Sequence, residues 1–351
     1  MKSFECPTKG YKESDVVTMA HGSGGGAMQR LIHEVFARHF PYLQKDTDAA
    51  VLSCEGGDIA FTTDSFVVDP LFFPGGNIGS LAVHGTINDL AMVSARAEVM
   101  SVAFIIEEGF PLSDLEKIVQ TMANEAEKQK VRIITGDTKV VEKGHGHGIY
   151  INTTGIGVRF GVRLRGGAWP SPKKVSVGDR ILVSGDIGRH GMAIMSVREN
   201  LPIETEITSD SAPLKELVIA LFEEGIHVSC MRDATRGGVA SALNEIARAR
   251  GVYLRINEEK IPVSEEVWGL SLILGIDPLH IANEGRFVLF VPKEEAEHAL
   301  FVLRDYEEGK NAEIIGEVMR EYEGGLVTAI TLLGSEKIIQ MPEGEILPRI
   351  C

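Results

Sequence analysis

The stretch Ala50-Val-Leu-Ser-Cys54, Glu55-Gly-Gly-Asp58, Ile59-Ala-Phe-Thr-Thr63 decides how the first half of the chain folds. Two short strand-like runs flank a Gly-Gly turn, which predicts an antiparallel hairpin. A hairpin joins its strands directly, whereas a parallel pair needs a helical crossover. The stretch therefore favours an α+β domain over a doubly wound dinucleotide-binding sheet.

The rest of the chain mixes helices and strands without regular βαβ order. Apolar residues recur at helical spacing over 113–130, where Ser113 and Glu116 predict a capping box. A segment rich in Gly and Pro, 166–172, is expected to link two domains. Further helices are expected at 77–91, 190–200, 211–224 and 237–250, and strands at 97–106, 131–135, 149–160, 226–230, 252–256, 286–291 and a final pair, 312–319 with 326–333.

Composition excludes several classes of function. The 351 residues carry 35 basic and 50 acidic side chains, a net charge of -15, so we expect neither nucleic acid nor an anionic membrane as a partner. The polar residues 1–15 show no signal peptide. The four cysteines, Cys6, Cys54, Cys230 and Cys351, form no CxxC pair, which indicates free thiols and a cytoplasmic protein.

A glycine-rich stretch, Gly22-Ser23-Gly24-Gly25-Gly26, precedes a helical pattern. Glycines let backbone N–H groups approach a phosphate, and a following helix N-terminus favours an anion. The stretch lacks a Walker A lysine, and the hairpin that follows disfavours a Rossmann fold. By itself it is equally compatible with a simple turn.

Several acidic residues are expected at the ends of elements in the first domain: Asp48, Asp64, Asp89 beside Asn88, and Asp137. A single acid in such a place is usually solvated or a helix cap. Four in one domain, together with the glycines, indicate Mg²⁺ with a nucleotide, because Mg²⁺ binds a few carboxylates plus phosphate oxygens.

Other residues are ambiguous on the sequence alone. Lys139 could be a charge clamp, a base or an exposed lysine, and Glu284 a buried acid or a turn residue. The thiol of Cys351 lies on the last residue, where the chain is free to move, which suits a group carrier better than a fixed nucleophile. His145 and His147 lie in a Gly-rich turn without a third ligand, so we discount a metal site there.

Taken together, the motifs resemble one superfamily along nearly the whole chain. In chain order they are His21-Gly-Ser-Gly-Gly-Gly26, Asp48-Ala-Ala-Val-Leu52, Thr63-Asp-Ser65, Ile87-Asn-Asp-Leu-Ala91, Thr135-Gly-Asp-Thr-Lys139, Asp233-Ala-Thr-Arg-Gly-Gly238 and Ala282-Asn-Glu-Gly285. The chain is similar in these motifs to the aminoimidazole ribonucleotide synthetase (PurM-like) superfamily of ATP-binding proteins, and its C-terminal Pro348-Arg-Ile-Cys351 resembles the HypE family of hydrogenase maturation factors.

The resemblance implies a two-domain α+β fold that dimerises through its N-terminal domains into a β-barrel-like interface. It implies an N-terminal segment with the glycine loop (1–44), an ATP-binding domain (45–165), a C-terminal α+β domain (173–335) and a mobile tail (336–351) that carries Cys351.

The resemblance also implies the members of the site. ATP and Mg²⁺ would be bound by Gly22, Ser23, Gly24, Gly25, Gly26, Asp48, Asp64, Asn88, Asp89 and Asp137, with Asp48, Asp64, Asp89 and Asp137 as the metal-binding acids. Cys351, Lys139 and Glu284 would be the catalytic residues.

The implied activity is an ATP-dependent carbamoyl dehydration on the enzyme's own cysteine. A HypF-like carbamoyltransferase would load a carboxamide onto Cys351, ATP would phosphorylate its oxygen, and loss of phosphate would leave a thiocyanate. A HypC–HypD-like complex would then receive the cyano group for the iron of a [NiFe] hydrogenase.

Two rival hypotheses remain. One is another PurM-like enzyme, such as a selenophosphate synthetase, which is expected to carry a reactive Cys and a Lys inside the glycine loop; this loop has neither. An aminoimidazole ribonucleotide synthetase would give no reason for a terminal thiol. The other rival is a nucleotide-binding scaffold whose tail docks a partner without turnover.

Overall fold

The computed structural model describes residues 16–40, 42–44, 46–55, 57–160, 169–198, 206–342, 344, 347 and 349–351. Residues 1–15 with Cys6, residues 166–168 of the expected linker, and Pro348 lie outside the described residues. Within the described ranges, no helix combines the length and the apolar character that crossing a membrane requires.

The first domain is built on a five-stranded sheet with the strand order β1-β2-β7-β5-β6. The predicted hairpin is confirmed: β1 and β2 pair antiparallel, with Ala50 opposite Phe61 and Cys54 opposite Gly57. Only β5 and β6 are parallel among the pairs of this sheet. The strands are β1 (Ala50–Cys54), β2 (Gly57–Phe66), β5 (Ala95–Glu107), β6 (Arg132–Val141) and β7 (Ile149–Arg159).

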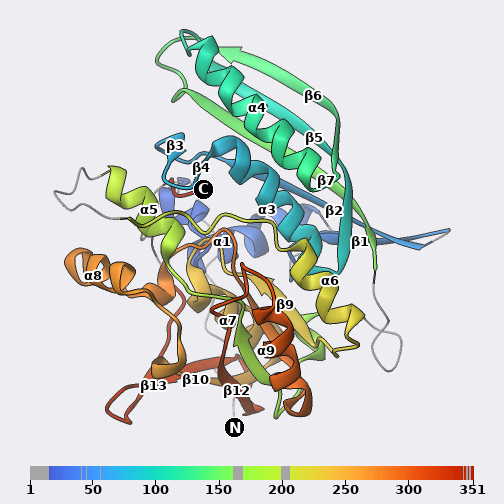
Figure 1. Ribbon diagram of the computed structural model, residues 1–351, viewed down its shortest axis with the longest axis vertical. Helices are drawn as coiled ribbons and strands as arrows, with labels where there is room; N and C mark the ends of the chain where they lie inside the picture. The colour runs from blue at the N-terminus through green and yellow to red at the C-terminus, as the bar shows by residue number, and fades with distance from the viewer. Residues whose placement is uncertain are drawn as a thin grey trace.

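Two helices, α3 (Ile78–Met92) and α4 (Leu112–Lys128), cover one face of this sheet (Figure 1). The buried face of α4 presents Ile118 and Met122 to the sheet, in line with its apolar periodicity. Within the described residues of the single chain, no element covers the other face of the sheet. It exposes large apolar side chains, among them Phe61, Ile105, Ile156 and Val158.

The second domain has three layers around a seven-stranded sheet, ordered β14-β13-β10-β12-β8-β11-β9. Helix α7 (Gly238–Arg250) packs on one face, and α6 (Lys215–Glu223) with α9 (Ala296–Arg304) on the other. The strands are β8 (Arg180–Val183), β9 (Cys230–Asp233), β10 (Val252–Asn257), β11 (Phe287–Val291), β12 (Glu313–Glu321), β13 (Leu326–Ile330) and β14 (Glu336–Ile338).

Shorter elements complete the molecule. They are η1 (Met19–Gly22), α1 (Gly26–Leu31), η2 (Ile32–Phe36), α2 (Ala37–His39), β3 (Phe72–Phe73), β4 (Gly76–Asn77), η3 (Pro172–Lys174), α5 (Arg189–Arg198), η4 (Glu258–Lys260), α8 (Glu265–Leu274), η5 (Pro278–His280) and η6 (Lys293–Glu295).

Some helix and strand predictions are wrong where contacts between distant segments determine the boundaries or the pairing of an element. Helix α4 begins at Leu112 after Pro111, without a side-chain cap, so the capping box at Ser113 and Glu116 is wrong. The expected final strand pair is also wrong, because β10 lies between β12 and β13 and pairs with both. Strand β6 runs on to Val141, which places Asp137 inside the strand rather than after it.

The fold class is the predicted two-domain α+β type, but neither sheet closes into a barrel within the described part of one chain. The tail begins later than expected. Residues 336–338 form β14 on the edge of the second sheet, and the Ile339 N–H donates to the Val327 carbonyl. Backbone pairing therefore holds the start of the segment that was expected to be mobile.

Helix α3 joins the two domains through Asn88, which is buried. The Asn88 side-chain amide donates to the Ala212 carbonyl at 2.9 Å and to the Glu284 carbonyl at 3.3 Å. Its oxygen accepts from the Leu214 N–H at 2.8 Å, at the start of α6. Asn88, expected to bind nucleotide, thus uses its polar atoms to hold the second domain against α3.

We expect Asn88→Ala to lower the free energy of unfolding by about 2–4 kcal/mol, because it leaves buried backbone groups without partners. Urea denaturation followed by circular dichroism measures the change. Asn311→Ala is the matched control, since this exposed residue makes one long hydrogen bond, at 3.5 Å to Asp186. Equal effects of the two substitutions would contradict the role given to Asn88.

Candidate active site

A cavity of about 560 Å³ lies between the domains. Asp48 precedes β1, Asp64 lies on β2 and Asp89 on α3, while Asp233 ends β9 of the second domain. Glu284 and the C-terminal Cys351 also line it. The fold thus brings three of the expected acids to one place and adds Asp233.

The carboxyl groups of these aspartates lie close enough to repel one another. Burial raises the pKa of Asp89 well above its usual value, and the neighbouring Asp233, Asp64 and Asp48 raise it further. Burial and the nearby Asp48 likewise raise the pKa of Asp233 well above its usual value. One hydrogen bond opposes this trend, because the Thr62 hydroxyl donates to Asp89 Oδ2 at 2.7 Å. A cation in the cavity would relieve the repulsion.

The donor set fits Mg²⁺ only in company with other ligands. Within the described ranges, no group of three acidic, His or Cys side chains is arranged to hold a metal ion by itself. Mg²⁺ in nucleotide sites typically keeps waters and binds one or two carboxylates plus phosphate oxygens. The converging carboxylates therefore suit a metal that arrives with a nucleotide.

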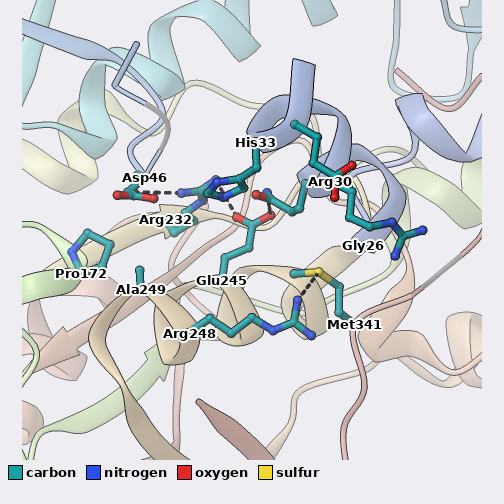
Figure 2. A pocket seen from close by; sticks show the side chains of 12 residues that line it. Gly26, Arg30, His33, Asp46, Pro172, Arg232, Glu245, Arg248, Ala249 and Met341 are labelled. Atoms are coloured by element: carbon teal, nitrogen blue, oxygen red, sulfur yellow. Dashed lines mark hydrogen bonds and ion pairs between the residues drawn. The ribbon is translucent and has the colours of Figure 1, made fainter. Parts of the chain in front are cut away.

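Arg232 of β9 is the counter-ion at the back of the cavity. Its Nε lies 3.1 Å from Asp48 Oδ1, and its Nη2 lies 2.6 Å from Glu245 Oε2 on α7. Figure 2 shows Arg232 paired directly with Glu245 where both line the adjoining pocket. Gln29 of α1 donates to the other Glu245 oxygen at 2.9 Å, which ties the helix after the glycine loop to this network.

The glycine loop, residues 22–26, packs against the second domain. A Cβ on Gly24, whose φ is +74°, would lie 2.7 Å from the Arg236 carbonyl oxygen. A Cβ on Gly25 would overlap the Pro342 carbonyl, which accepts from the Gly26 N–H at 3.0 Å. Close backbone approach therefore requires glycine at these two positions. The loop borders the cavity at Gly24, while Gly22 and Ser23 line the neighbouring pocket beside the tail.

The tail is docked with its last residue in the cavity (Figure 1 shows the C-terminus beside β3 and β4). The Val67 N–H donates to the terminal carboxylate of Cys351 at 3.0 Å, and the Asp69 N–H donates to the Arg349 carbonyl at 3.2 Å. Burial raises the pKa of the Cys351 thiol, while the positive charge of Arg236 opposes this shift. The docked sulfur is therefore a neutral thiol.

Glu284 is the acid with the least support from hydrogen bonds. The residue is 4% exposed, and its buried Oε1 has no hydrogen-bond partner among the described residues. Burial raises its pKa well above the usual value, and Asp233 and Asp64 add repulsion. A buried carboxyl with a free oxygen beside Cys351 is suited to accept or donate a proton there.

Asp137 and Lys139 lie elsewhere. Both are on β6, the edge strand of the first sheet, with side chains 64% and 73% exposed. Their carboxylate and ammonium groups are 3.5 Å apart, and neither residue lines the cavity of its own chain. A single chain therefore does not bring these two expected site residues to Cys351.

Sequence reasoning missed Asp233, Arg232, Arg236 and Glu245 as members of the site. The motif Asp233–Gly238 carries the family resemblance, but the sequence predicts that the strand before it ends at residue 230. Strand β9 instead starts at Cys230 and carries Arg232 and Asp233 toward α3. The sequence signal that could have located these residues is the Gly-Gly pair at the start of α7, because paired glycines allow another backbone segment to pack closely there.

A carboxyl whose pKa is raised by folding binds its proton more tightly in the folded state. Its contribution to stability therefore falls as the pH rises above its unfolded value, 4.5 for Glu284. We expect the free energy of unfolding to fall less between about pH 5.5 and about pH 8 in Glu284→Gln than in the wild type. Urea denaturation at both pH values measures this, with the exposed Glu259→Gln as control. If the unfolding free energy of Glu284→Gln falls as steeply with pH as that of the wild type, Glu284 is not the buried carboxyl with the raised pKa.

Comparison with known proteins places the chain in a family. Residues 46–159 match the model of the AIR synthase related protein N-terminal domain, and residues 176–328 match that of the C-terminal domain. The carbamoyl dehydratase HypE of Azotobacter vinelandii is 47% identical over 337 residues, which cover 95% of this chain and 97% of that protein.

Solved structures agree. The hydrogenase maturation protein HypE in complex with ATP superposes with a TM-score of 0.79 at 43% identity, covering 96% of this chain and 100% of that one. A chain from a HypE–HypF complex superposes with a TM-score of 0.82 at 50% identity, covering 89% and 99%. The chain therefore belongs to the HypE family of carbamoyl dehydratases, within the AIR synthase related proteins.

Proposed function

We propose that this protein converts a carboxamide on its own Cys351 into a thiocyanate, with ATP as the dehydrating agent, and so supplies the cyanide ligand of the iron in a [NiFe] hydrogenase. The observation that carries the proposal is the docked Cys351 in a cavity lined by four aspartates from both domains. The curated HypE relatives are named carbamoyl dehydratases, and a HypE chain is known in complex with ATP.

The proposed reaction balances without a redox partner. The amide oxygen of Cys351–S–C(=O)NH₂ attacks the γ-phosphorus of ATP, and ADP leaves. The C–O bond then breaks, so that this oxygen departs as part of inorganic phosphate, and both protons leave the nitrogen. The product is Cys351–S–C≡N. Phosphorylation is needed because an amide oxygen is otherwise a poor leaving group.

The acids would hold the triphosphate through Mg²⁺. Asp48, Asp64 and Asp89, joined by Asp233, are the ligands we assign, and the bound metal would neutralise the phosphate charge. Arg232 keeps Asp48 in place, and the glycine loop covers the cavity at Gly24. The positive charge of Mg²⁺ would favour the ionised form of Glu284, which would then take one of the two nitrogen protons. Exclusion of water would protect the phosphorylated intermediate from hydrolysis.

We assign the second proton to Lys139 and a metal contact to Asp137, both supplied by a partner subunit. The uncovered face of the first sheet supports this assignment, because exposed Phe61, Ile105 and Ile156 form an apolar surface that a second copy would bury. Pairing of two such sheets would give the barrel-like interface of a homodimer. It would carry the partner subunit's Asp137 and the partner subunit's Lys139 to the cavity.

Two further partners belong to the proposal. A HypF-like carbamoyltransferase would load Cys351, in keeping with the known HypE–HypF complex, and a HypC–HypD-like complex would receive the cyano group. We place the reaction in the cytoplasm. The tail supports both transfers, since a cysteine on the last residue can leave the cavity once its anchoring bonds break.

The direct test uses intact mass of the C-terminal peptide. With a HypF-like carbamoyltransferase and its substrates, Cys351 should gain a carboxamide, and addition of Mg-ATP should then remove one water. A nucleotide-binding scaffold, or a selenophosphate synthetase, would leave the carboxamide unchanged after ATP. Cys351→Ala should keep the ATP affinity and lose carboxamide-dependent phosphate release; loss of ATP binding as well would make the tail structural.

Sharing of the site between subunits is tested by mixing two inactive variants. Asp137→Asn keeps the cysteine, and Cys351→Ala keeps the acid. If the acid acts across the interface, mixed dimers regain one intact site, and a statistical mixture recovers about a quarter of wild-type activity. Activity that stays at the level of the separate variants would show that Asp137 does not act on the partner's Cys351.

A further inference from the structure

A buried histidine of the second domain holds the tail next to its cysteine. His190 of α5 is fully buried, and its Nε2 lies 2.8 Å from the carbonyl oxygen of Ile350. That carbonyl belongs to the peptide bond that joins Ile350 to Cys351. An anchor on this peptide fixes the position from which the cysteine side chain projects.

The hydrogen-bond network sets the tautomer of His190. Ser209 Oγ accepts from the Ser211 N–H at 3.0 Å, so its hydroxyl proton is free to point at His190 Nδ1, 2.8 Å away. Nδ1 is therefore the acceptor nitrogen, and Nε2 carries the proton that it donates to Ile350. Phe73 packs edge-on against the imidazole ring, 5.5 Å between centroids, and limits its rotation.

The same segment is bonded to the loop that carries Glu284. Asp210 is buried, and its Oδ1 accepts from the His190 N–H at 2.8 Å. Its Oδ2 accepts from the Glu284 N–H at 3.2 Å and from the Gly285 N–H at 3.0 Å. One carboxylate thus fixes the backbone of the tail anchor relative to the backbone of the buried acid.

We infer that His190 is a positioning residue that sets the register of the Ile350–Cys351 peptide against Glu284, with Asp210 as the rigid link between them. The inference rests on the proposed function, because it gives the tail a productive docked position. Neither His190 nor Asp210 belongs to any of the sequence motifs described above. Their role follows from three elements that meet only in the folded chain: α5, the 209–211 segment and the 283–285 loop.

The test compares two substitutions in the full-length protein, one that removes the hydrogen-bond donor and one that retains it. His190→Phe keeps a ring but has no donor, whereas His190→Gln places an amide N–H near the position of Nε2. The readout is the rate of Cys351 alkylation by iodoacetamide, resolved by peptide mass. Exposed Cys54 serves as internal reference. We expect His190→Phe to alkylate Cys351 roughly tenfold faster than the wild type, and His190→Gln to stay close to the wild type.

The alkylation rate of Cys351 can be measured without a carboxamide. It therefore tests the His190 anchor independently of the proposed dehydration reaction. An unchanged Cys351 rate in a folded His190→Phe protein, or a faster rate for His190→Gln than for His190→Phe, would overturn the anchor. With loaded enzyme, we expect His190→Phe to lower the rate of water loss while KM for ATP is unchanged, and His190→Gln to restore the rate. An equal loss in both variants, with normal Cys351 protection in His190→Gln, would overturn the positioning role.

Discussion

Four aspartates line one cavity between the domains, and the rest of the site is arranged around their repulsion. Asp89 and Asp233 come from different domains, and burial together with the neighbouring acids raises the pKa of each. Arg232 neutralises Asp48 on one side, and Arg236 Nη2 lies 4.0 Å from Asp64 on the other. The protein maintains this unfavourable charge cluster at the junction of its domains, where bound metal and phosphate would convert it into a favourable one.

Many individually weak contacts hold the docked tail. Its last three residues accept hydrogen bonds from Val67, Asp69, His190 and Arg198, and the Arg349 side chain donates back to the Val67 carbonyl. Burial of Ile350 adds to this stabilisation, whereas the ordering of these residues and the left-handed backbone of Arg349, at φ +49°, oppose it. A carrier that must visit both a closed cavity and a separate protein needs contacts that can break one at a time.

The sequence was most informative where the signal is local. The hairpin follows from strand-forming runs around Gly-Gly, and the acids of the first domain could be named because they lie in short motifs near strand and helix ends. Asn88 has the same local signal, yet its amide bridges the domains. The position of β10 between β12 and β13 and the anchor at His190 depend on contacts between distant segments. The periodicity of apolar residues along the sequence does not predict such long-range contacts.

The glycine loop contacts the chain segments that lead to the tail as well as the cavity. Its glycines allow backbone to approach the Arg236 and Pro342 carbonyls, and Pro342 lies on the chain that leads to the tail. Arg236 in turn donates to the Gly22 carbonyl at 3.2 Å and opposes the raised pKa of Cys351. The loop that borders the cavity and the chain that delivers the cysteine therefore share contacts. If the loop opens to admit a nucleotide, these contacts must break, and the order of nucleotide entry and tail docking is then constrained by the packing of three backbone segments.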